Sequence, residues 1–554
     1  MPEPRYVARV ALLPRLIERL AKLPPATHRV GRVERDVSIP MDDGAQLLAD
    51  VYHPGGAEPA PSVLMRSPYG RRSFGGLFGE IHARRGFRLI VQSCRGTFGS
   101  GGSFRPQFDE RDDGLATLRW IQAQSWFDGR LAMSGPSYLG YVQWAIASDA
   151  SPPLTALCPH ITMSSLAGHW YAGGSFSLDD AIGWTALVSG QERRFAGLDR
   201  LFGTTARRVA RHIDGLPLLT LDERIVGRPV PFWRDFVSHA SAQDPFWAPA
   251  DHTRRVAGVR APVAMVSGWY DIFLPLQVTD YRALASAGNP PWLVIGPWTH
   301  TSFPGMGEQL RDSLAWCAAH LRGDRSQLRA DPVRLHVMGA DEWRGFASWP
   351  PPGYAAEAWH LHGGGRLARE APGVSEPDAY RYDPADPTPI AGGTLLSAAG
   401  GRRDQRATEA RRDVLVYTSD ALDRDVEVIG EVSAEIFVSS NSGHFDVFVR
   451  LCDVDERGRS TNVCDGIQRI EPGRGQQRTD AVLAVRVALW PTAQRFRKGH
   501  RIRVQVSSGA HPRFARNLGT GEPLATGTAL RPSEQSIHHA PGRASAILLP
   551  LRSL

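Results

Sequence analysis

The stretch LAMSGPSYLG, residues 131–140, places a serine between an apolar run and a helical pattern. The apolar start predicts a short buried strand, a Gly-Pro pair breaks it, and residues 138–146 carry apolar side chains at helical spacing. A serine on a sharp turn between a strand and a helix is the setting of a nucleophile elbow. The general elbow is G-x-S-x-G, but Leu139 stands where its second glycine belongs, so Ser137 matches that motif incompletely.

Other short apolar runs end in turn signals in the same way. Residues 112–124, between two of these runs, have helical spacing and open with acids that suit a helix N-terminus. Strands that alternate with helices and are apolar on both sides predict a parallel sheet covered on both faces, and hence an α/β core. The runs are residues 62–69, 87–96, 131–135, 263–271 and 292–300.

The sequence changes character twice along the chain. Residues 149–255 are rich in aromatic residues and helical in pattern, which predicts a cap inserted after the elbow helix. From residue 353 onward, alternating segments such as FDVFVRLCDV (445–454) lie between turn residues and predict an antiparallel sandwich, in the form of a two-sheet jelly roll. The predicted domains are an α/β domain in two parts, 1–148 and 256–352, the cap at 149–255 and the sandwich at 353–554.

Composition limits the class of protein. A chain of 554 residues that is 42% hydrophobic is too long for a single core. Its net charge of +7 rests on cations that are all arginine except Lys22 and Lys498, and these are scattered among acids. This pattern favours an arginine-rich genome over a nucleic-acid partner. Five cysteines without a C-x-x-C pair argue against a disulfide framework or a zinc site and indicate a reducing, cytoplasmic setting.

The N-terminal segment 5–23 predicts an amphipathic helix with basic residues throughout, and it lacks the features of a signal peptide. Nowhere is there a run of about 18 apolar residues, so no stable membrane insertion is expected. We expect this helix to pack on its own domain or on another subunit, which leaves a homodimer open, rather than on a membrane surface.

Acyl transfer by serine needs a base, a carboxylate that orients the base, and donors for the developing oxyanion. In α/β-hydrolases the three side chains occur in the order Ser, Asp or Glu, then His, each after a strand. Ser137, Asp271 and His300 have that order, since the aspartate follows the strand VAMVS and the histidine follows WLVIG. Together they form a candidate catalytic triad.

Each member has a plainer interpretation when taken alone. A serine after a Gly-Pro turn is often only a helix N-cap, and an aspartate after a strand can also cap a helix. His300 competes with other histidines near predicted strand ends or in the cap, including His160, His169 and His252. The joint order and placement favour catalysis over three independent coincidences.

Two further motifs receive structural interpretations. The glycine-rich loop CRGTFGSGG (94–102) lacks the Gly-Lys-Ser/Thr ending of a phosphate-binding loop and predicts a tight turn near the active site. The acidic run DERDDG (109–114) predicts a solvated helix start rather than a metal site, because no matching ligand cluster occurs elsewhere. No metal and no cofactor are expected.

The motifs GPSYLG, CRGTFGSGG, SPYGR, GWYD and GPWTH together resemble the family of cocaine esterase and the Xaa-Pro dipeptidyl-peptidases. The nucleophile motif of that family is G-x-S-Y-x-G, which residues 135–140 match in full. The resemblance implies an α/β-hydrolase domain, a helical cap and a C-terminal jelly roll, and it covers nearly the whole chain after about residue 30.

The resemblance also implies roles for individual residues. Ser137 is then the nucleophile, His300 the general base and acid, and Asp271 the residue that orients the imidazole. The family's oxyanion hole maps to the backbone N–H of Tyr138 and the hydroxyl of Tyr69 in SPYGR. A phenol is a good donor, and its loop lies where other hydrolases offer a backbone amide.

The substrate is predicted to be a small-molecule ester or amide with an uncharged acyl group. Family members that bind a free α-amino group carry carboxylates two and three residues after the triad aspartate, where this chain has Phe273 and Leu274. Asp179 or Asp180 of the cap could replace them, which keeps an Xaa-Pro dipeptidyl-peptidase or an acylase as alternatives. A third alternative is a non-catalytic carbohydrate-binding protein with a residual triad. The residues predicted to line an apolar acyl pocket are Trp269, Phe273, His169 and Trp170.

Overall fold

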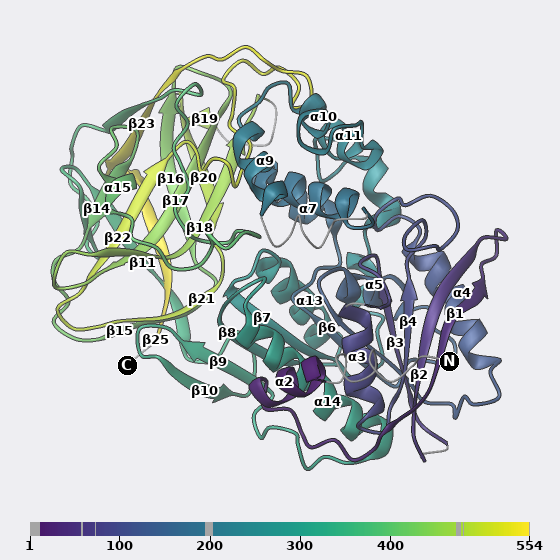
Figure 1. Cartoon of the computed structure of the whole chain (residues 1–554). Coiled ribbons are helices and arrows are strands. Elements are labelled where there is room, and N and C mark those ends of the chain that lie inside the picture. The colour runs from purple at the N-terminus through teal and green to yellow at the C-terminus, as the bar shows by residue number, and fades with distance from the viewer. Residues whose placement is uncertain are drawn as a thin grey trace.

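The computed structural model describes residues 12–56, 59–72, 74–193, 203–472, 478–479 and 481–552. An α/β part carries a group of helices above it, and an all-β part lies beside both (Figure 1). Within the described residues, none of the helices has both the length and the apolar character that crossing a membrane requires.

The α/β part is built on one mixed sheet. Strands β1 and β2 pair antiparallel at one edge, whereas β3 to β6 and β7 to β9 include the parallel pairs. A bridge between Leu157 and Val263 joins the two halves. Every residue of β3 is buried, as expected for a parallel strand covered on both faces. The strands are β1 (Val30–Pro40), β2 (Gln46–Pro54), β3 (Ser62–Ser67), β4 (Arg88–Ser93), β5 (Leu131–Pro136), β6 (Ala156–His160), β7 (Ala264–Tyr270), β8 (Trp292–Thr299), β9 (Val333–Val337) and β10 (Glu342–Phe346).

Helices cover this sheet, and α14 packs against β5, β6 and β7. The predicted N-terminal helix is described only from residue 12, so residues 5–11 of that prediction lie outside the described residues. Its described part, α2, packs on α3, and Glu18 accepts hydrogen bonds from Arg84 and Arg85. The helices are α2 (Leu12–Leu20), α3 (Phe74–Ala83), α4 (Glu110–Gln122), α5 (Tyr138–Ile146), α13 (Leu274–Ser286) and α14 (Phe303–Arg322).

The region predicted as a helical cap, 149–255, begins differently from the expectation. Residues 156–160 form β6, a fully buried strand that pairs parallel to β5, so the helical insertion starts only after it. Five residues that contain a proline give too little pattern to predict a strand. The helices above the sheet are α6 (Leu166–Trp170), α7 (Leu178–Gly190), α9 (Thr204–His212), α10 (Leu221–Val226), α11 (Pro231–Ser238) and α12 (Thr253–Val256), with 3₁₀ turns η1 (Ala172–Gly174), η2 (Leu218–Thr220) and η3 (Pro245–Ala250).

The C-terminal part is all-β apart from the short helix α15 (Arg406–Glu409). Since β10 ends at Phe346 and β11 begins at Tyr354, the predicted boundary at 352/353 falls between them, and it stays a prediction. The strands are β11 (Tyr354–His362), β12 (Arg366–Ala368), β13 (Asp378–Tyr382), β14 (Leu415–Thr418), β15 (Val426–Gly430), β16 (Ser433–Ser440), β17 (Phe445–Val454), β18 (Ser460–Ile470), β19 (Arg478–Thr479), β20 (Val482–Ala488), β21 (Thr492–Phe496), β22 (Arg501–Ser507), β23 (Ser533–Ala540), β24 (Arg543–Ala544) and β25 (Ala546–Arg552).

Candidate active site

Ser137 occupies a strained turn between β5 and α5. Its φ is 58° and its ψ is −123°, a conformation that a non-glycine residue rarely adopts and that costs free energy. Hydrogen bonds hold the turn: the Ser137 N–H donates to the His160 carbonyl at 2.9 Å, and its own carbonyl accepts from Thr162 Oγ1 at 2.7 Å. The structure therefore presents this serine on an elbow.

The same turn explains why glycine occupies position 140 instead of position 139. A Cβ atom on Gly140 would lie 2.6 Å from side-chain atoms of Thr162, closer than real contacts allow. Leu139, in contrast, packs over Gly135, whose φ of 149° and lack of a side chain permit that contact. Compared with the general elbow motif, the glycine that permits close packing stands at position 140 instead of 139, because α5 approaches Thr162 there.

Ser137, His300 and Asp271 form a continuous chain of side-chain contacts. The Ser137 Oγ lies 3.1 Å from His300 Nε2, and His300 Nδ1 lies 2.8 Å from Asp271 Oδ2. The structure brings together the three residues that the sequence analysis selected from separate strand ends. This is the geometry in which a histidine can take the proton of a serine hydroxyl while a carboxylate orients the imidazole.

Asp271 is fully buried and held on several sides. The Phe273 N–H donates to its Oδ1 at 2.8 Å, which fixes the carboxylate, and the Phe273 ring stands edge-on to the His300 imidazole. The backbone carbonyl of Asp271 accepts a hydrogen bond from the Trp490 indole at 3.2 Å. The β domain therefore contributes a side chain to this site, and no local motif indicates this contact.

The two predicted oxyanion donors lie beside Ser137. Tyr69 and Tyr138 both line the cavity that contains the serine. Burial raises the pKa of the Tyr69 hydroxyl to about 12, so it carries its proton at neutral pH, and it accepts a hydrogen bond from Trp184 Nε1 at 3.0 Å. Tyr138 is the first residue of α5, where backbone N–H groups lack helical acceptors.

The acidic run at 109–114 is not simply solvated, contrary to the sequence prediction. Glu110 and Asp113 are buried. The Glu110 carboxylate accepts a hydrogen bond from the Tyr138 hydroxyl at 2.6 Å and pairs with the fully buried Arg66 at 2.8 Å. Glu110 thus anchors the first residue of the elbow helix, which local sequence could not indicate because its partners, Arg66 in β3 and Tyr138 in α5, are distant in the chain.

A narrow cavity of about 40 Å³ opens from Ser137 and His300 into the protein. Three of the four predicted pocket residues line it, namely Phe273, His169 and Trp170. Trp269 does not fit its predicted role, because its indole donates to the His336 carbonyl at 2.7 Å and its ring packs on Trp349. The other lining residues are Tyr69, Gln107, Tyr138, Met163, Leu166, Asp180, Trp184, Ile272 and Leu396.

A much larger cleft of about 1020 Å³ opens on the outer side of Ser137 and His300. Its lining is mainly apolar, and among the helices α7 and α9 contribute the largest share of it. Two spaces of very different size therefore meet at the serine. Over the described parts of the chain, no group of histidine, cysteine and acidic side chains is arranged to hold a metal ion.

An elbow serine, a bonded histidine and a buried aspartate on this fold define a serine hydrolase of the α/β-hydrolase class. Residues 43–302 match the family model of the X-Pro dipeptidyl-peptidases (S15 family), and residues 328–548 match that of the X-Pro dipeptidyl-peptidase C-terminal non-catalytic domain. The chain is 33% identical to the cocaine esterase of Rhodococcus sp. (strain MB1 Bresler), across 94% of this chain and 98% of that protein. It belongs to the family of cocaine esterase and the X-Pro dipeptidyl-peptidases.

Solved structures agree on the fold. An α-amino acid ester hydrolase labelled with selenomethionine has a TM-score of 0.80 at 21% identity and covers 96% of this chain and 98% of its own. An aminopeptidase from a marine sediment archaeon, Thaumarchaeota archaeon, has a TM-score of 0.78 at 23% identity, with the same coverage. The predicted α/β-hydrolase domain followed by an all-β domain is confirmed, and membership among serine hydrolases speaks against the non-catalytic alternative.

Proposed function

We propose that the chain hydrolyses carboxylic esters with an uncharged acyl group through a covalent acyl-enzyme on Ser137. The observation that carries this proposal is the chain of contacts from Ser137 Oγ through His300 to Asp271. A serine hydroxyl is a weak nucleophile unless a base accepts its proton, and His300 Nε2 lies within hydrogen-bond reach of it.

In the proposed reaction, Ser137 Oγ attacks the ester carbonyl while His300 Nε2 takes the hydroxyl proton. The carbonyl oxygen becomes an oxyanion that the Tyr69 hydroxyl and the Tyr138 N–H stabilise, and Asp271 stabilises the imidazolium. His300 then returns the proton to the departing alcohol. Water attacks the acyl-enzyme with His300 again as base, which releases the acid and restores the serine.

The two spaces at Ser137 suggest how a substrate is oriented. The narrow pocket is walled by aromatic and aliphatic side chains, including Phe273 and Trp184, and suits the acyl group. The wide cleft, which also reaches Ser137 and His300, suits a bulky leaving alcohol. The places two and three residues after Asp271, where an ammonium-binding relative would carry carboxylates, are occupied by Phe273 and Leu274.

The dipeptidyl-peptidase alternative requires a group that receives an α-ammonium. Asp180 lines the narrow pocket and is the carboxyl group there that could receive an α-ammonium. Burial raises the pKa of its carboxyl to about 7, so the carboxylate form that an ammonium needs is disfavoured below neutral pH.

Labelling with a fluorophosphonate, followed by peptide mapping, tests the nucleophile. We expect Ser137 to take the label and p-nitrophenyl esters to turn over, with kcat in Ser137→Ala lower by roughly 10⁴- to 10⁶-fold. Turnover no faster than in Ser137→Ala, together with an unlabelled Ser137, would contradict the proposal. Release of p-nitroaniline from an Ala-Pro anilide at a higher kcat/KM than any ester would favour the peptidase instead.

A further inference from the structure

A second cavity of about 200 Å³ lies directly behind the narrow acyl pocket. Residues of the cap, of the segment that follows β7 and of the β domain form it, and His169, Asp180 and Ile272 line both spaces. These three side chains therefore lie at the junction of the acyl pocket and the cavity behind it, which we call the rear chamber. Its other lining residues include Trp490, Arg513, Thr394, Leu276 and Phe514.

Three polar atoms of the rear chamber lack hydrogen-bond partners among the described residues: His169 Nε2, Thr394 Oγ1 and Arg513 Nη2. Each of these residues is no more than 5% exposed. His169 Nε2 lies 3.8 Å from Asp180 Oδ2, beyond hydrogen-bond distance. Buried polar groups are almost always bonded, because an unpaired one loses its hydration without compensation, so three in one cavity point to a ligand group that bonds them.

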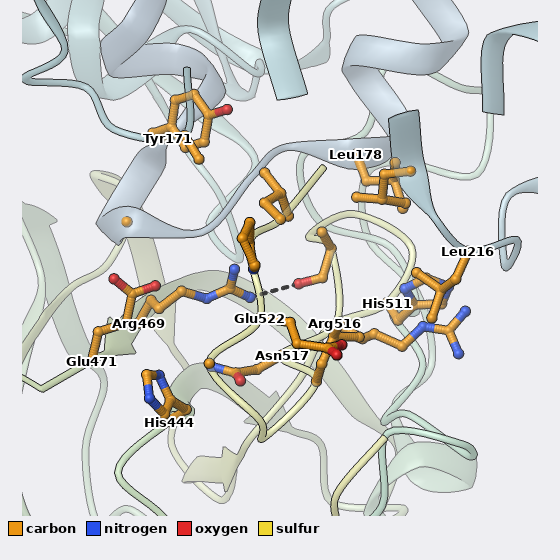
Figure 2. A pocket seen from close by; sticks show the side chains of 18 of the residues that line it. Tyr171, Leu178, Leu216, His444, Arg469, Glu471, His511, Arg516, Asn517 and Glu522 are labelled. Atoms are coloured by element: carbon orange, nitrogen blue, oxygen red, sulfur yellow. Dashed lines mark hydrogen bonds between the residues drawn. The ribbon is translucent and has the colours of Figure 1, made fainter. Parts of the chain in front are cut away.

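A larger cavity of about 310 Å³ between cap and β domain, shown in Figure 2, makes a contrast. Arg469 there donates to Asp446 and to the Ala515 carbonyl, and Arg516 donates to two backbone carbonyls. Asn517 likewise bonds within the protein. These three side chains already have partners, and among the described lining residues of that cavity His511 Nδ1 is the one buried side-chain atom that lacks a partner. The rear chamber has three such atoms, so the need for a ligand is greater there.

The charges around the rear chamber favour a neutral ligand group. Arg513 is bound to Asp465, which also pairs with Arg450, and it faces Asp180 across the chamber. A terminal ammonium would meet the Arg513 guanidinium, and a terminal carboxylate would meet the Asp180 carboxyl. His169 brings no charge, because burial lowers its pKa to about 3.

The hydrogen-bond donors and acceptors of the chamber residues favour one kind of neutral end group on the ligand. Arg513 Nη2 can only donate, so it requires an acceptor such as a carbonyl oxygen. Asp180 in its ionised form can only accept, while the Thr394 hydroxyl and the neutral His169 ring suit either a donor or an acceptor. A primary carboxamide carries a carbonyl oxygen and two N–H groups on one small planar unit and meets these needs together.

We propose that the rear chamber is a specificity subsite for acyl groups with an apolar body and a terminal carboxamide. This inference rests on the proposed function, since the acyl chain must be attached at Ser137. The body of the chain would occupy the narrow pocket, and its end would pass the junction residues His169 and Asp180 and bond them together with Arg513 and Thr394. With this subsite, the preferred acyl group is uncharged, as predicted, but carries a polar end.

The test compares p-nitrophenyl esters of four acids that differ at the far end of the chain: heptanoic, adipamic, adipic and aminohexanoic acid. We expect kcat/KM for the adipamoyl ester to exceed that for the heptanoyl ester by about tenfold, the effect of one or two net hydrogen bonds. Thr394→Val should remove most of this preference. Thr492→Val is the matched control, because the Thr492 hydroxyl is also buried without a described partner but does not line the chamber.

Equal or faster hydrolysis of the heptanoyl ester by the wild-type enzyme would overturn the subsite while leaving the esterase intact. A preference for the adipic or the aminohexanoic ester would overturn it as well, because the end group would then be charged. Failure of the proposed function has another signature: none of the four esters turns over faster than with Ser137→Ala, and Ser137 takes no fluorophosphonate label. Because the substrate preference is a ratio within one enzyme preparation, partial misfolding of Thr394→Val cannot mimic it.

Discussion

The Trp490 indole N–H donates a hydrogen bond across 3.2 Å to the backbone carbonyl of Asp271. The tryptophan belongs to the β domain and the aspartate to the proposed triad, so the two domains meet at that triad. Arg513 stacks over the indole at 4.5 Å and is bound to Asp465, which fixes the ring in place. The domain whose family model is described as non-catalytic thus supports the site.

Replacing Trp490 by phenylalanine keeps a large ring but removes the N–H. We expect kcat for an ester to fall about five- to tenfold with KM unchanged, because one hydrogen bond that positions Asp271 is lost and no substrate contact is. Trp359→Phe is the control, since the Trp359 indole is also buried but has no hydrogen-bond partner among the described residues. An unchanged kcat in Trp490→Phe would show that the contact does not position the triad.

Glu110→Gln should destabilise the enzyme by about 3–5 kcal/mol, because it leaves the buried Arg66 guanidinium without its nearest counter-charge. Arg66 is fully buried and pairs with Glu110 at 2.8 Å, whereas Asp113 lies 3.9 Å away. Urea unfolding followed by tryptophan fluorescence measures the change. The exposed Glu370, which pairs with Arg366, supplies the control Glu370→Gln, for which the unfolding midpoint should stay at the wild-type value.

Much of the architecture could be predicted because its signals are local. The elbow, the buried parallel strands and the placement of each triad member after a strand depend on a few neighbouring residues and a known periodicity. The position of Gly140, odd by the general motif, turned out to reflect its approach to Thr162. At this turn the residue that the motif carries, a glycine at position 140, is also the residue that the packing of α5 requires.

What could not be predicted depends on contacts between distant segments. The burial of Glu110 follows from Arg66 and Tyr138, and the role of Trp490 follows from how the β domain packs. Trp269 precedes Asp271 by only two residues, but β7 ends at Tyr270 and its register against β8 shifts between Gly268 and Tyr270, and the Trp269 indole turns to His336.

Asp280 predicts a pH dependence of stability. Burial raises the pKa of its carboxyl to about 8, and one oxygen accepts a hydrogen bond from Ser164 at 2.6 Å. The folded protein therefore keeps a proton that the unfolded chain releases near pH 4, so stability falls as pH rises from about 4 to 8 and levels off above that range.

Asp280→Asn cannot lose this proton and should reduce that decline. Between pH 5 and pH 8 the variant should gain up to about 4 kcal/mol of unfolding free energy relative to the wild type. Thermal unfolding at both pH values measures the difference, with Asp386→Asn as the control, since Asp386 is exposed and paired with Arg411. An identical pH slope in Asp280→Asn and the wild type would contradict the assignment.

Tyr69→Phe tests the proposed oxyanion donor. The Trp184 N–H donates to the Tyr69 oxygen, and the Tyr69 hydroxyl also interacts with the Ser137 side chain, which places its proton to bond an oxyanion there. Because that bond strengthens as negative charge develops, its loss should lower kcat about 10²- to 10³-fold while KM changes little. The control is Tyr380→Phe, whose buried hydroxyl bonds Ser508 in the β domain. Full activity in Tyr69→Phe would transfer the oxyanion role to backbone N–H groups alone. Since burial raises the pKa of Tyr69 to about 12, ionisation of this tyrosine should not lower wild-type activity below about pH 11.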